Sequence, residues 1–304
     1  SVWMLSFLVD RKQFVKIGCS VSDLYVGLTK AGAPQGTRAG PTDFKTLIKD
    51  LCFEYPYVKY VDDVTVAAVS TDPRINNMQL VADKLVQWCA DNHMHLNTSK
   101  TKEMVIYFGK QYSKSELVYA RIADSNIERF ETFKLLGVIF SSDLTWKAHV
   151  EYIISKASKR IFVVYQLVRS GLSASDVISV YIALIRSILE YACPVWHCGI
   201  TKGQSDEIEG VQRRCLRIVY PELSYSDSLQ IAGLEQLRVR RERLVHNLFN
   251  EMKSSNHVLN NLLPLRSFDN GRYNVRDLYP YCMPIARTGR PLRSFISYCV
   301  RKRF

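Results

Sequence analysis

The sequence predicts an α+β fold in which a mixed or antiparallel sheet with helices precedes a helical region. Up to residue 140, short β-branched and aromatic runs alternate with two segments of helical period. From residue 146, apolar residues recur every three or four positions over long segments. Four prolines then interrupt the basic C-terminal segment, which we expect to be irregular. The predicted domains are residues 1–145, 146–253 and 254–304.

The N-terminal elements follow from local patterns. Two β-type runs, residues 13–17 and 23–26, are joined around Gly18. A turn segment rich in glycine and proline covers residues 30–41. A helix is expected over residues 42–51, and a hairpin follows around Asp62 and Asp63. The expected apolar face of that helix consists of Phe44, Leu47, Ile48 and Leu51.

Further elements continue this layer. A capping side chain and a proline at 71–73 predict the start of a helix that runs to about residue 91. Strands are expected around Leu96, over residues 103–108 and over residues 133–140. The helical region then contains four amphipathic helices. They lie between residues 150 and 170, 173 and 188, 208 and 219, and 237 and 252.

Composition narrows the class of partner. The net charge of +12 over 304 residues points to a polyanion, either nucleic acid or an anionic membrane surface. No apolar run approaches the roughly 20 residues that span a bilayer, so nucleic acid is favoured and no membrane partner is expected. The N-terminus lacks the order of a signal peptide, and no methionine precedes Met4, so we expect a fragment of a longer protein.

The eight cysteines show no disulfide spacing, which indicates a reducing compartment, the nucleus or the cytoplasm, and no secretion. Cys193, His197, Cys198 and Cys215 form the one group whose spacing could suggest zinc. Their spacing lacks a matching second pair, so we favour packing cysteines over a metal site. The two histidines of the 93–95 segment are taken as structural.

Asp62 and Asp63 interrupt two β-type runs without a glycine beside them. Adjacent carboxylates repel unless a cation neutralises them, and Mg²⁺ prefers such oxygen ligands. Two-metal phosphoryl transfer uses carboxylates in this way, although two aspartates usually need a third carboxylate from a neighbouring strand. The alternative is an ordinary acidic turn. The segment 31–41 adds glycines that let a backbone approach a substrate closely, with a structural loop as its alternative.

Several motifs in order resemble the reverse transcriptases of non-LTR retrotransposons, the jockey-like LINE group. The segment 32–41 resembles their PQG box, and residues 60–63, Tyr-Val-Asp-Asp, are similar to their YxDD box. Residues 96–102 and 133–138 look like later palm motifs, and residues 189–197 resemble the thumb of these enzymes. The closing segment 293–296 also looks like the end of their reading frames, so the resemblance covers nearly the whole chain.

The resemblance implies an RNA-directed DNA polymerase: a partial right-hand palm followed by an α-helical thumb. Its partners would be an RNA template, a DNA primer and deoxynucleoside triphosphates, with Mg²⁺ (or Mn²⁺) as cofactor. Asp62 and Asp63 would be the catalytic metal ligands, with Asp62 favoured as the direct one. Tyr60 would lie near the primer end, and Lys100 or Lys102 near the triphosphate. The residues that would line the nucleotide and template are Pro34, Gln35, Gly36, Thr37 and Arg38.

The resemblance also implies a departure from the family. The first catalytic carboxylate of these enzymes lies upstream of the segment that matches residues 2–17, so we expect this chain alone to lack one metal ligand and to be inactive. The alternative is a non-catalytic nucleic-acid-binding remnant, either decayed or recruited by a host. Protein partners cannot be deduced from the sequence.

Basic residues flank the apolar faces of the predicted thumb helices. They would neutralise phosphates along a primer–template, which gives salt-dependent binding without sequence preference. The alternative is a solvated helix face. The candidates on the first and third helices are Lys156, Lys159, Arg160, Arg213, Arg214 and Arg217. The fourth helix adds Arg238, Arg240, Arg241 and Arg243.

Overall fold

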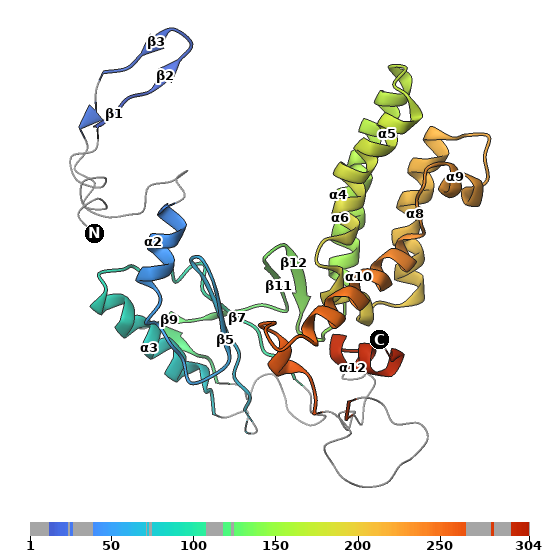
Figure 1. Cartoon of the computed structure of the whole chain (residues 1–304). Coiled ribbons are helices and arrows are strands. Elements are labelled where there is room, and N and C mark those ends of the chain that lie inside the picture. The colour runs from blue at the N-terminus through green and yellow to red at the C-terminus, as the bar shows by residue number, and fades with distance from the viewer. Residues whose placement is uncertain are drawn as a thin grey trace. The chain divides into compact units, whose positions relative to one another are not determined.

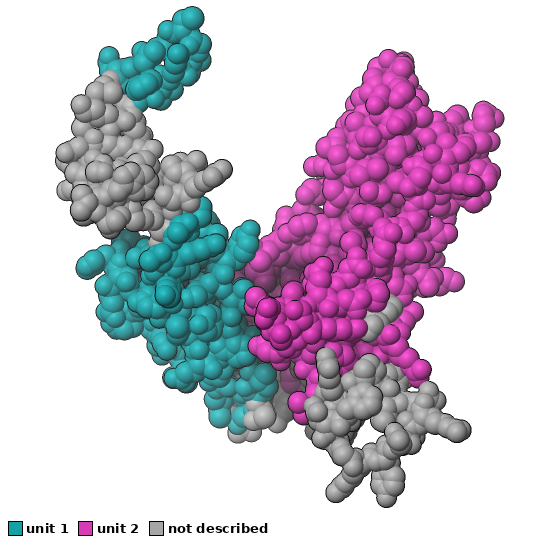
Figure 2. All heavy atoms as spheres, in the orientation of Figure 1, with its two compact units in different colours: residues 1–101, 110–128 teal, residues 102–109, 129–304 magenta. Residues whose placement is uncertain are grey.

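The structure is a computed structural model that combines short strands with long helices, as predicted (Figure 1). It describes residues 12–23, 25–26, 39–70, 72, 75–107, 118–122, 125–265, 281–282 and 293–303. The chain forms two compact units, coloured separately in Figure 2. The first unit, called the sheet unit below, contains residues 1–101 and 110–128. The second, the helical unit, contains residues 102–109 and 129–304.

The sheet unit is built from antiparallel strand pairs and two helices. Its strands are β1 (Lys12–Gln13), β2 (Lys16–Ile17), β3 (Ser20–Val21), β4 (Tyr25–Val26), β5 (Tyr57–Tyr60), β6 (Asp63–Val66), β8 (Arg121–Ile122) and β9 (Ser125–Asn126). Strand pairs β1–β4 and β2–β3 are nested around a turn at Gly18, whose φ is +60°. The turn predicted at this glycine is therefore confirmed, because glycine adopts the left-handed conformation without strain.

Helix α2 (Ala39–Leu47) begins and ends earlier than the sequence pattern predicted. Gly40 and Pro41 belong to its first turn, where a proline costs little because its N–H would have no partner. The predicted apolar face was partly wrong: Ile48 and Leu51 are buried in the turn and loop that follow, but Leu47 is 46% exposed.

Helix α3 (Met78–Asp91) starts later than predicted. The Asn76 side chain accepts a hydrogen bond from the Met78 N–H at 2.9 Å, so an asparagine near the helix start takes the role expected of the residues at 71–73. The helix packs on β8 through Gln79, which exchanges two hydrogen bonds with the backbone of Arg121. The strand predicted around Leu96 was wrong, since the chain there is irregular.

The helical unit opens with strands. They are β7 (Lys102–Glu103), β11 (Thr132–Leu135) and β12 (Val138–Ser141), and β10 (Glu128–Arg129) spans the division between the units. The single strand predicted over residues 133–140 is instead a hairpin, with Leu135 opposite Val138. Leu136 and Gly137 form its two-residue turn with φ of +46° and +87°. Positive φ at both positions is the geometry that suits the twist of antiparallel strands.

The helices of this unit largely follow the predicted periodicity. They are α4 (Lys147–Arg169), α5 (Ala174–Tyr181), the π-helical turn η2 (Ile182–Arg186), α6 (Ser187–Glu190), α7 (Cys193–Trp196), the 3-10 turn η3 (His197–Gly199), α8 (Lys202–Val219), α9 (Tyr225–Ile231), α10 (Leu237–Met252), the 3-10 turn η4 (Asn260–Leu262) and α12 (Phe295–Lys302). The predicted cap of α5 is confirmed, because the Ser173 side chain accepts from the Asp176 N–H. Helix α12 contradicts the irregular structure expected of the C-terminal segment; its first-turn Ile296 and the buried Val300 pack in one apolar cluster with Phe249.

Helices α4 and α8 pack along each other around a core that includes Val150, Ala157, Tyr181 and Val211. A buried carboxylate joins this core to α10: Glu209 accepts from the Leu237 N–H at 3.2 Å and the Arg238 N–H at 3.3 Å. The first backbone donors of α10 are thus satisfied by a side chain from another helix. Sequence patterns close to α10 gave no sign of this tertiary cap.

One helical stretch, Ala174–Gly199, is long and apolar enough to cross a membrane by length and composition. The expectation that no apolar run has this length was therefore too strict. The stretch is divided into α5, η2, α6, α7 and η3, and its Val177, Tyr181 and Leu189 are buried in the core of the helical unit. The core helix of a folded protein passes the same test.

Candidate functional site

The Asp62 and Asp63 pair lies at the tip of the β5–β6 hairpin, as the sequence predicted. Tyr60 pairs with Asp63 across the strands, so Val61 and Asp62 form a two-residue turn. Both carboxylates are exposed, and the Tyr60 ring is 60% exposed beside them. The hairpin therefore presents two adjacent carboxylates and one aromatic side chain to solvent at one point.

Val61 adopts an unusual backbone conformation in this turn. Its φ is +54°, in the left-handed region that β-branched residues rarely enter. Two-residue hairpins normally place glycine at this position. The strain is of the order of 1–3 kcal/mol, and such outliers concentrate at functional sites. The turn thus holds Asp62 in place at a cost in stability.

The opposite face of the hairpin anchors it to the sheet unit. Tyr57, Val64 and Val66 pack on a cluster centred on Leu51 and Phe53. The Phe53 and Tyr57 rings meet edge to face at a centroid distance of 5.4 Å. Burial of alternate residues on one face leaves Val58, Tyr60, Asp63 and Thr65 on the other. Packing therefore holds one face of the hairpin against the sheet unit, while the tip of the hairpin stays exposed to solvent.

Lys59 anchors the hairpin in a second way. Its ammonium group donates to the carbonyl oxygens of Ile48 at 2.7 Å and Leu51 at 2.8 Å, and to that of Lys49 at 3.3 Å. These carbonyls follow the C-terminal end of α2, where a positive charge is favourable. Sequence reasoning missed this role. The signal that could have revealed it is a lysine at an inward-facing position of an alternating strand.

The donor set at the tip fits a divalent metal ion. Two neighbouring carboxylates supply hard oxygen ligands, and no neighbouring cation is paired with them in the described ranges. No group of three or more histidine, cysteine, aspartate or glutamate side chains gathers in those ranges. The candidate ligands in the described ranges are therefore the Asp62 and Asp63 pair.

Among the other predicted site residues of the first 110 positions, the structure describes Lys100 and Lys102 but not residues 34–38. Lys100 lies in a turn held by Asn97, whose side chain accepts from the Lys100 N–H at 3.1 Å. Lys102 is in β7 of the helical unit, with its ammonium group 4.8 Å from the Phe130 ring centroid. Pro34, Gln35, Gly36, Thr37 and Arg38 lie outside the described residues.

The predicted basic residues of the helical unit serve different purposes. Lys159 and Arg217 are exposed and form no ion pair among the described residues. Arg160 donates from Nη1 to the carbonyl oxygen of Leu184 at 2.9 Å, within the π-helical turn. Arg214 donates to the Ser158 hydroxyl at 2.9 Å and so joins α8 to α4.

The structure also shows the contacts of two further predicted nucleic-acid-binding residues, Arg213 and Arg241. The guanidinium carbon of Arg213 lies 5.0 Å from the Tyr225 ring centroid. Arg241 was expected on a nucleic-acid face, and this was wrong: it is fully buried, and its Nη2 donates to the Ser205 hydroxyl at 2.8 Å. Burial lowers the pKa of its guanidinium, and the side chain is closed to a large ligand.

Lys134 and Lys156 converge on one tyrosine. The Lys134 ammonium donates to the Tyr152 hydroxyl at 2.8 Å, and the Lys156 ammonium lies 5.9 Å from the same ring centroid. The Lys134 hydrogen bond and the two positive charges lower the pKa of the Tyr152 hydroxyl. Lys134 comes from β11, and Tyr152 and Lys156 come from α4. The β11–β12 hairpin and helix α4 therefore share a basic surface around this tyrosine.

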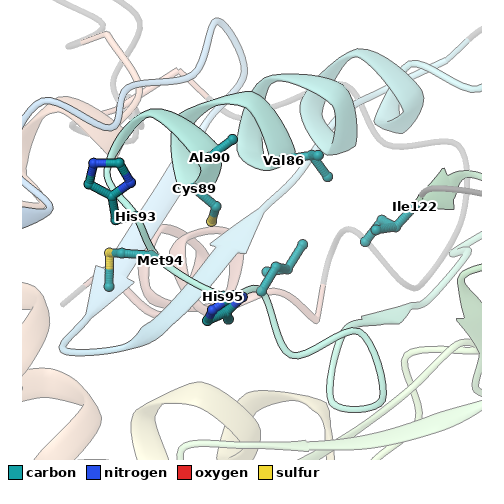
Figure 3. Close-up of a pocket in the computed structure, with 8 residues that line it drawn as sticks. Val86, Cys89, Ala90, His93, Met94, His95 and Ile122 are labelled. Atoms are coloured by element: carbon teal, nitrogen blue, oxygen red, sulfur yellow. The ribbon is translucent and has the colours of Figure 1, made fainter. Parts of the chain in front are cut away.

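His93 and His95, which the sequence analysis took as structural, line a cavity of about 480 Å³ at the end of α3 (Figure 3). Its other walls are mainly apolar and include Cys89, Leu96 and Ile122. Burial raises the pKa of the Cys89 thiol. No carboxylate lines this cavity, which therefore offers apolar surface and imidazole groups.

The cysteines of the group that could have suggested zinc lie in the helical core. Cys193 and Cys215 are buried in the main cluster, and burial raises the pKa of each thiol to about 12. Cys198 is buried in a neighbouring cluster with Cys299. A thiol must lose its proton to bind zinc, so this burial opposes metal binding.

Comparison with known proteins assigns a class to this arrangement. Residues 4–140 match the family described as Reverse transcriptase (RNA-dependent DNA polymerase), and the Asp62 hairpin lies inside this range. This match covers a little less than half of the chain and relates residues 4–140 to the reverse transcriptases. A second match is to a transposon protein: 225 residues, 70% of the chain, are 23% identical to "Probable RNA-directed DNA polymerase from transposon X-element" of Drosophila melanogaster. The chain spans 24% of that protein. No solved structure matches the present chain.

Proposed function

We propose that this chain supplies the palm and thumb of an RNA-directed DNA polymerase of a non-LTR retrotransposon. The observation that carries the proposal is the hairpin tip, which presents Asp62 and Asp63 side by side within the matched reverse transcriptase range. The sheet unit would form part of the palm and the helices from α4 onward the thumb. Template RNA, primer DNA and deoxynucleoside triphosphates are the proposed partners. The proposed location is the nucleus or the cytoplasm.

The chemistry is nucleotidyl transfer. The primer 3′-hydroxyl loses its proton to solvent, its oxygen forms a bond to the α-phosphorus of the nucleotide, and the bond to pyrophosphate breaks. Asp62 and Asp63 would hold divalent ions, Mg²⁺ in the first place, which neutralise the charge that develops on the attacking and leaving oxygens. The chain's own contribution is positional: Lys59 and the buried face of the hairpin fix the carboxylates.

The remaining site residues take supporting roles in this proposal. Tyr60, exposed beside the carboxylates, would contact the primer end. Lys100 or Lys102 would offset triphosphate charge or act as a general acid. Residues 34–38 would line the nucleotide and template. Lys156, Lys159, Arg160, Arg213, Arg214 and Arg217 would face the phosphates, although Arg160 and Arg214 also hold helices together.

A second candidate function, nucleic-acid binding without polymerisation, is favoured by the basic surface around Tyr152, because these residues belong to the helical unit and not to the unit that carries the aspartates. Two assays on the 304-residue protein separate the candidates. Primer–template affinity should fall steeply with salt for both. Deoxynucleotide incorporation that disappears in Asp62→Asn supports the polymerase. Because the chain alone is expected to be inactive, salt-dependent binding without incorporation fits both candidates, and Mn²⁺ binding that Asp62→Asn weakens then supports the polymerase. Primer–template binding that ignores salt contradicts both.

A further inference from the structure

A polar cavity lies in the helical unit between the π-helical turn η2 and the start of α10. Its volume is about 470 Å³, and its charged lining is Arg186 from η2, Arg240 and Arg243 from α10, and the carboxylate Glu235 just before α10. The loop after α9 closes it with Ala232 and Gly233. We call this cavity the arginine pocket.

The arginines form a continuous chain of ion pairs with two glutamates. Glu190 Oε1 lies 3.7 Å from Arg186 Nε and 2.6 Å from Arg240 Nε. Glu235 Oε1 lies 3.8 Å from Arg240 Nη1 and 2.5 Å from Arg243 Nη2. Three guanidinium groups thus share two carboxylates, which leaves one positive charge uncompensated.

The hydrogen-bond donors are also in excess. Each guanidinium carries five N–H donors, more in total than two carboxylates can accept. The buried Arg240 Nε is held by Glu190 at 2.6 Å, so an added ligand would contact the other guanidinium N–H groups at the cavity wall. The oxygens of such a ligand would accept from donors that the two carboxylates cannot satisfy.

Local backbone features create the space. The π-helical turn widens the helix at residues 182–186, and such turns are frequent at functional sites. Gly233 turns the chain after α9 with φ of +62°, and Ala232 places only a methyl group toward the cavity wall. The side chains of Arg186 and Arg240 are 13% and 25% exposed, so their charges are partly removed from water.

We propose that the arginine pocket binds a phosphate group. Guanidinium forks match the oxygens of a phosphate in pairs, and three forks around one cavity suit a tetrahedral anion better than a flat carboxylate. The phosphate can come from a nucleic-acid backbone or from a free phosphate compound. The site is independent of Asp62 and Asp63, so a failure of the polymerase proposal leaves it standing.

Calorimetric titration of the 304-residue protein with inorganic phosphate tests the site. Arg243→Gln removes the most exposed of the three guanidiniums, at 53% side-chain exposure, and should leave the fold intact. It should weaken phosphate binding about 10-fold, which corresponds to about 1.4 kcal/mol. Lys202→Gln removes one charge from an exposed position at the start of α8 and should have almost no effect. An equal loss in both variants, or no saturable binding by the parent chain, contradicts the proposal.

A second variant keeps every charge. Ala232→Phe fills the cavity, and phosphate binding should be lost in protein that thermal denaturation shows to be folded, because Ala232 also packs against the cluster of Ile178, Leu216 and Leu229. Binding that persists in this variant shows that the cavity is not the site. Competition by an RNA duplex then identifies the source: displacement of phosphate by RNA that requires Arg243 assigns the pocket to a backbone phosphate. Phosphate binding that RNA does not displace assigns it to a free phosphate compound.

Discussion

The Lys59 ammonium lies 2.7 Å from the carbonyl oxygen of Ile48 and ties the strand before the aspartate pair to the end of α2. In Lys59→Met the carbonyl oxygens of Ile48, Lys49 and Leu51 lose the ammonium donor, while residue 59 keeps an unbranched apolar side chain. Because hydrogen bonds to charged groups contribute about 1.5–3 kcal/mol, we expect a loss of about 2 kcal/mol in the free energy of unfolding of the sheet unit. Urea denaturation measures it. Lys84→Met, at an exposed position of α3, should change stability by less than about 0.5 kcal/mol, and equal effects would refute the anchoring role.

Replacement of Val61 should stabilise the hairpin. Asparagine tolerates the left-handed conformation that Val61 adopts at φ +54°, so Val61→Asn should raise the free energy of unfolding by about 1 kcal/mol. Thermal denaturation provides the measurement. Val58→Asn, on the exposed face of β5, should instead destabilise slightly because asparagine is poor in strands. A loss of stability in Val61→Asn would show that the turn is not strained.

The turn of the β11–β12 hairpin should tolerate no side chain at Gly137. Its φ is +87°, and an added Cβ would lie 3.0 Å from Cε1 of Tyr191. Gly137→Ala should therefore lose about 2 kcal/mol of stability, from backbone strain and from the collision with the ring. Tyr191→Ala in the same chain should recover only the steric part. If the double variant loses the sum of both single losses, the ring does not restrict this position.

Two buried histidines should make the helical unit sensitive to acid. Burial lowers the pKa of His149 to about 4, and burial together with the charge of Arg241 lowers that of His197 to about 4. Both histidines stay neutral in the folded state, while the unfolded chain takes up protons below about pH 6.5. Stability is therefore complete above this pH and falls between pH 6.5 and 4, by at most about 3 kcal/mol for each histidine.

His149→Gln tests the assignment. Glutamine retains an acceptor for the Ile139 N–H, to which His149 Nδ1 is bonded at 3.3 Å, but it does not titrate. The variant should show a flatter dependence of unfolding free energy on pH, measured by urea denaturation at pH 7.5, 6 and 5. An unchanged slope would remove His149 from the account.

Long periodic segments were the part of the fold that the sequence predicted well. Helices α4 and α10 agree with their apolar spacing, and Ser173 marks the start of α5 as a serine cap should. Short strands were harder, because two residues carry too little pattern. The hairpin turn at Leu136 and Gly137 was read as one strand because leucine rarely adopts positive φ.

The candidate site was likewise predicted only in part from the sequence. Adjacent aspartates are visible in the sequence, and the structure places them at a hairpin tip. The anchoring role of Lys59 was missed because its partners are backbone carbonyls, and a pattern of side chains in the sequence does not reveal such contacts. Arg241 was misjudged because α10 turns it into the core, while Arg240 and Arg243 on the same helix stay partly exposed. Tertiary contacts decide both cases.

The most direct test of the central claim is a titration of the 304-residue protein with Mn²⁺, followed by electron paramagnetic resonance in the presence of primer–template and a deoxynucleoside triphosphate. Asp62→Asn should weaken Mn²⁺ binding by about 10-fold or more, because it removes a charged oxygen ligand. Glu54→Gln, which removes an exposed carboxylate elsewhere in the sheet unit, should leave the binding unchanged. Equal Mn²⁺ affinity in the parent chain and in Asp62→Asn would contradict the assignment of this hairpin as a metal-holding polymerase site.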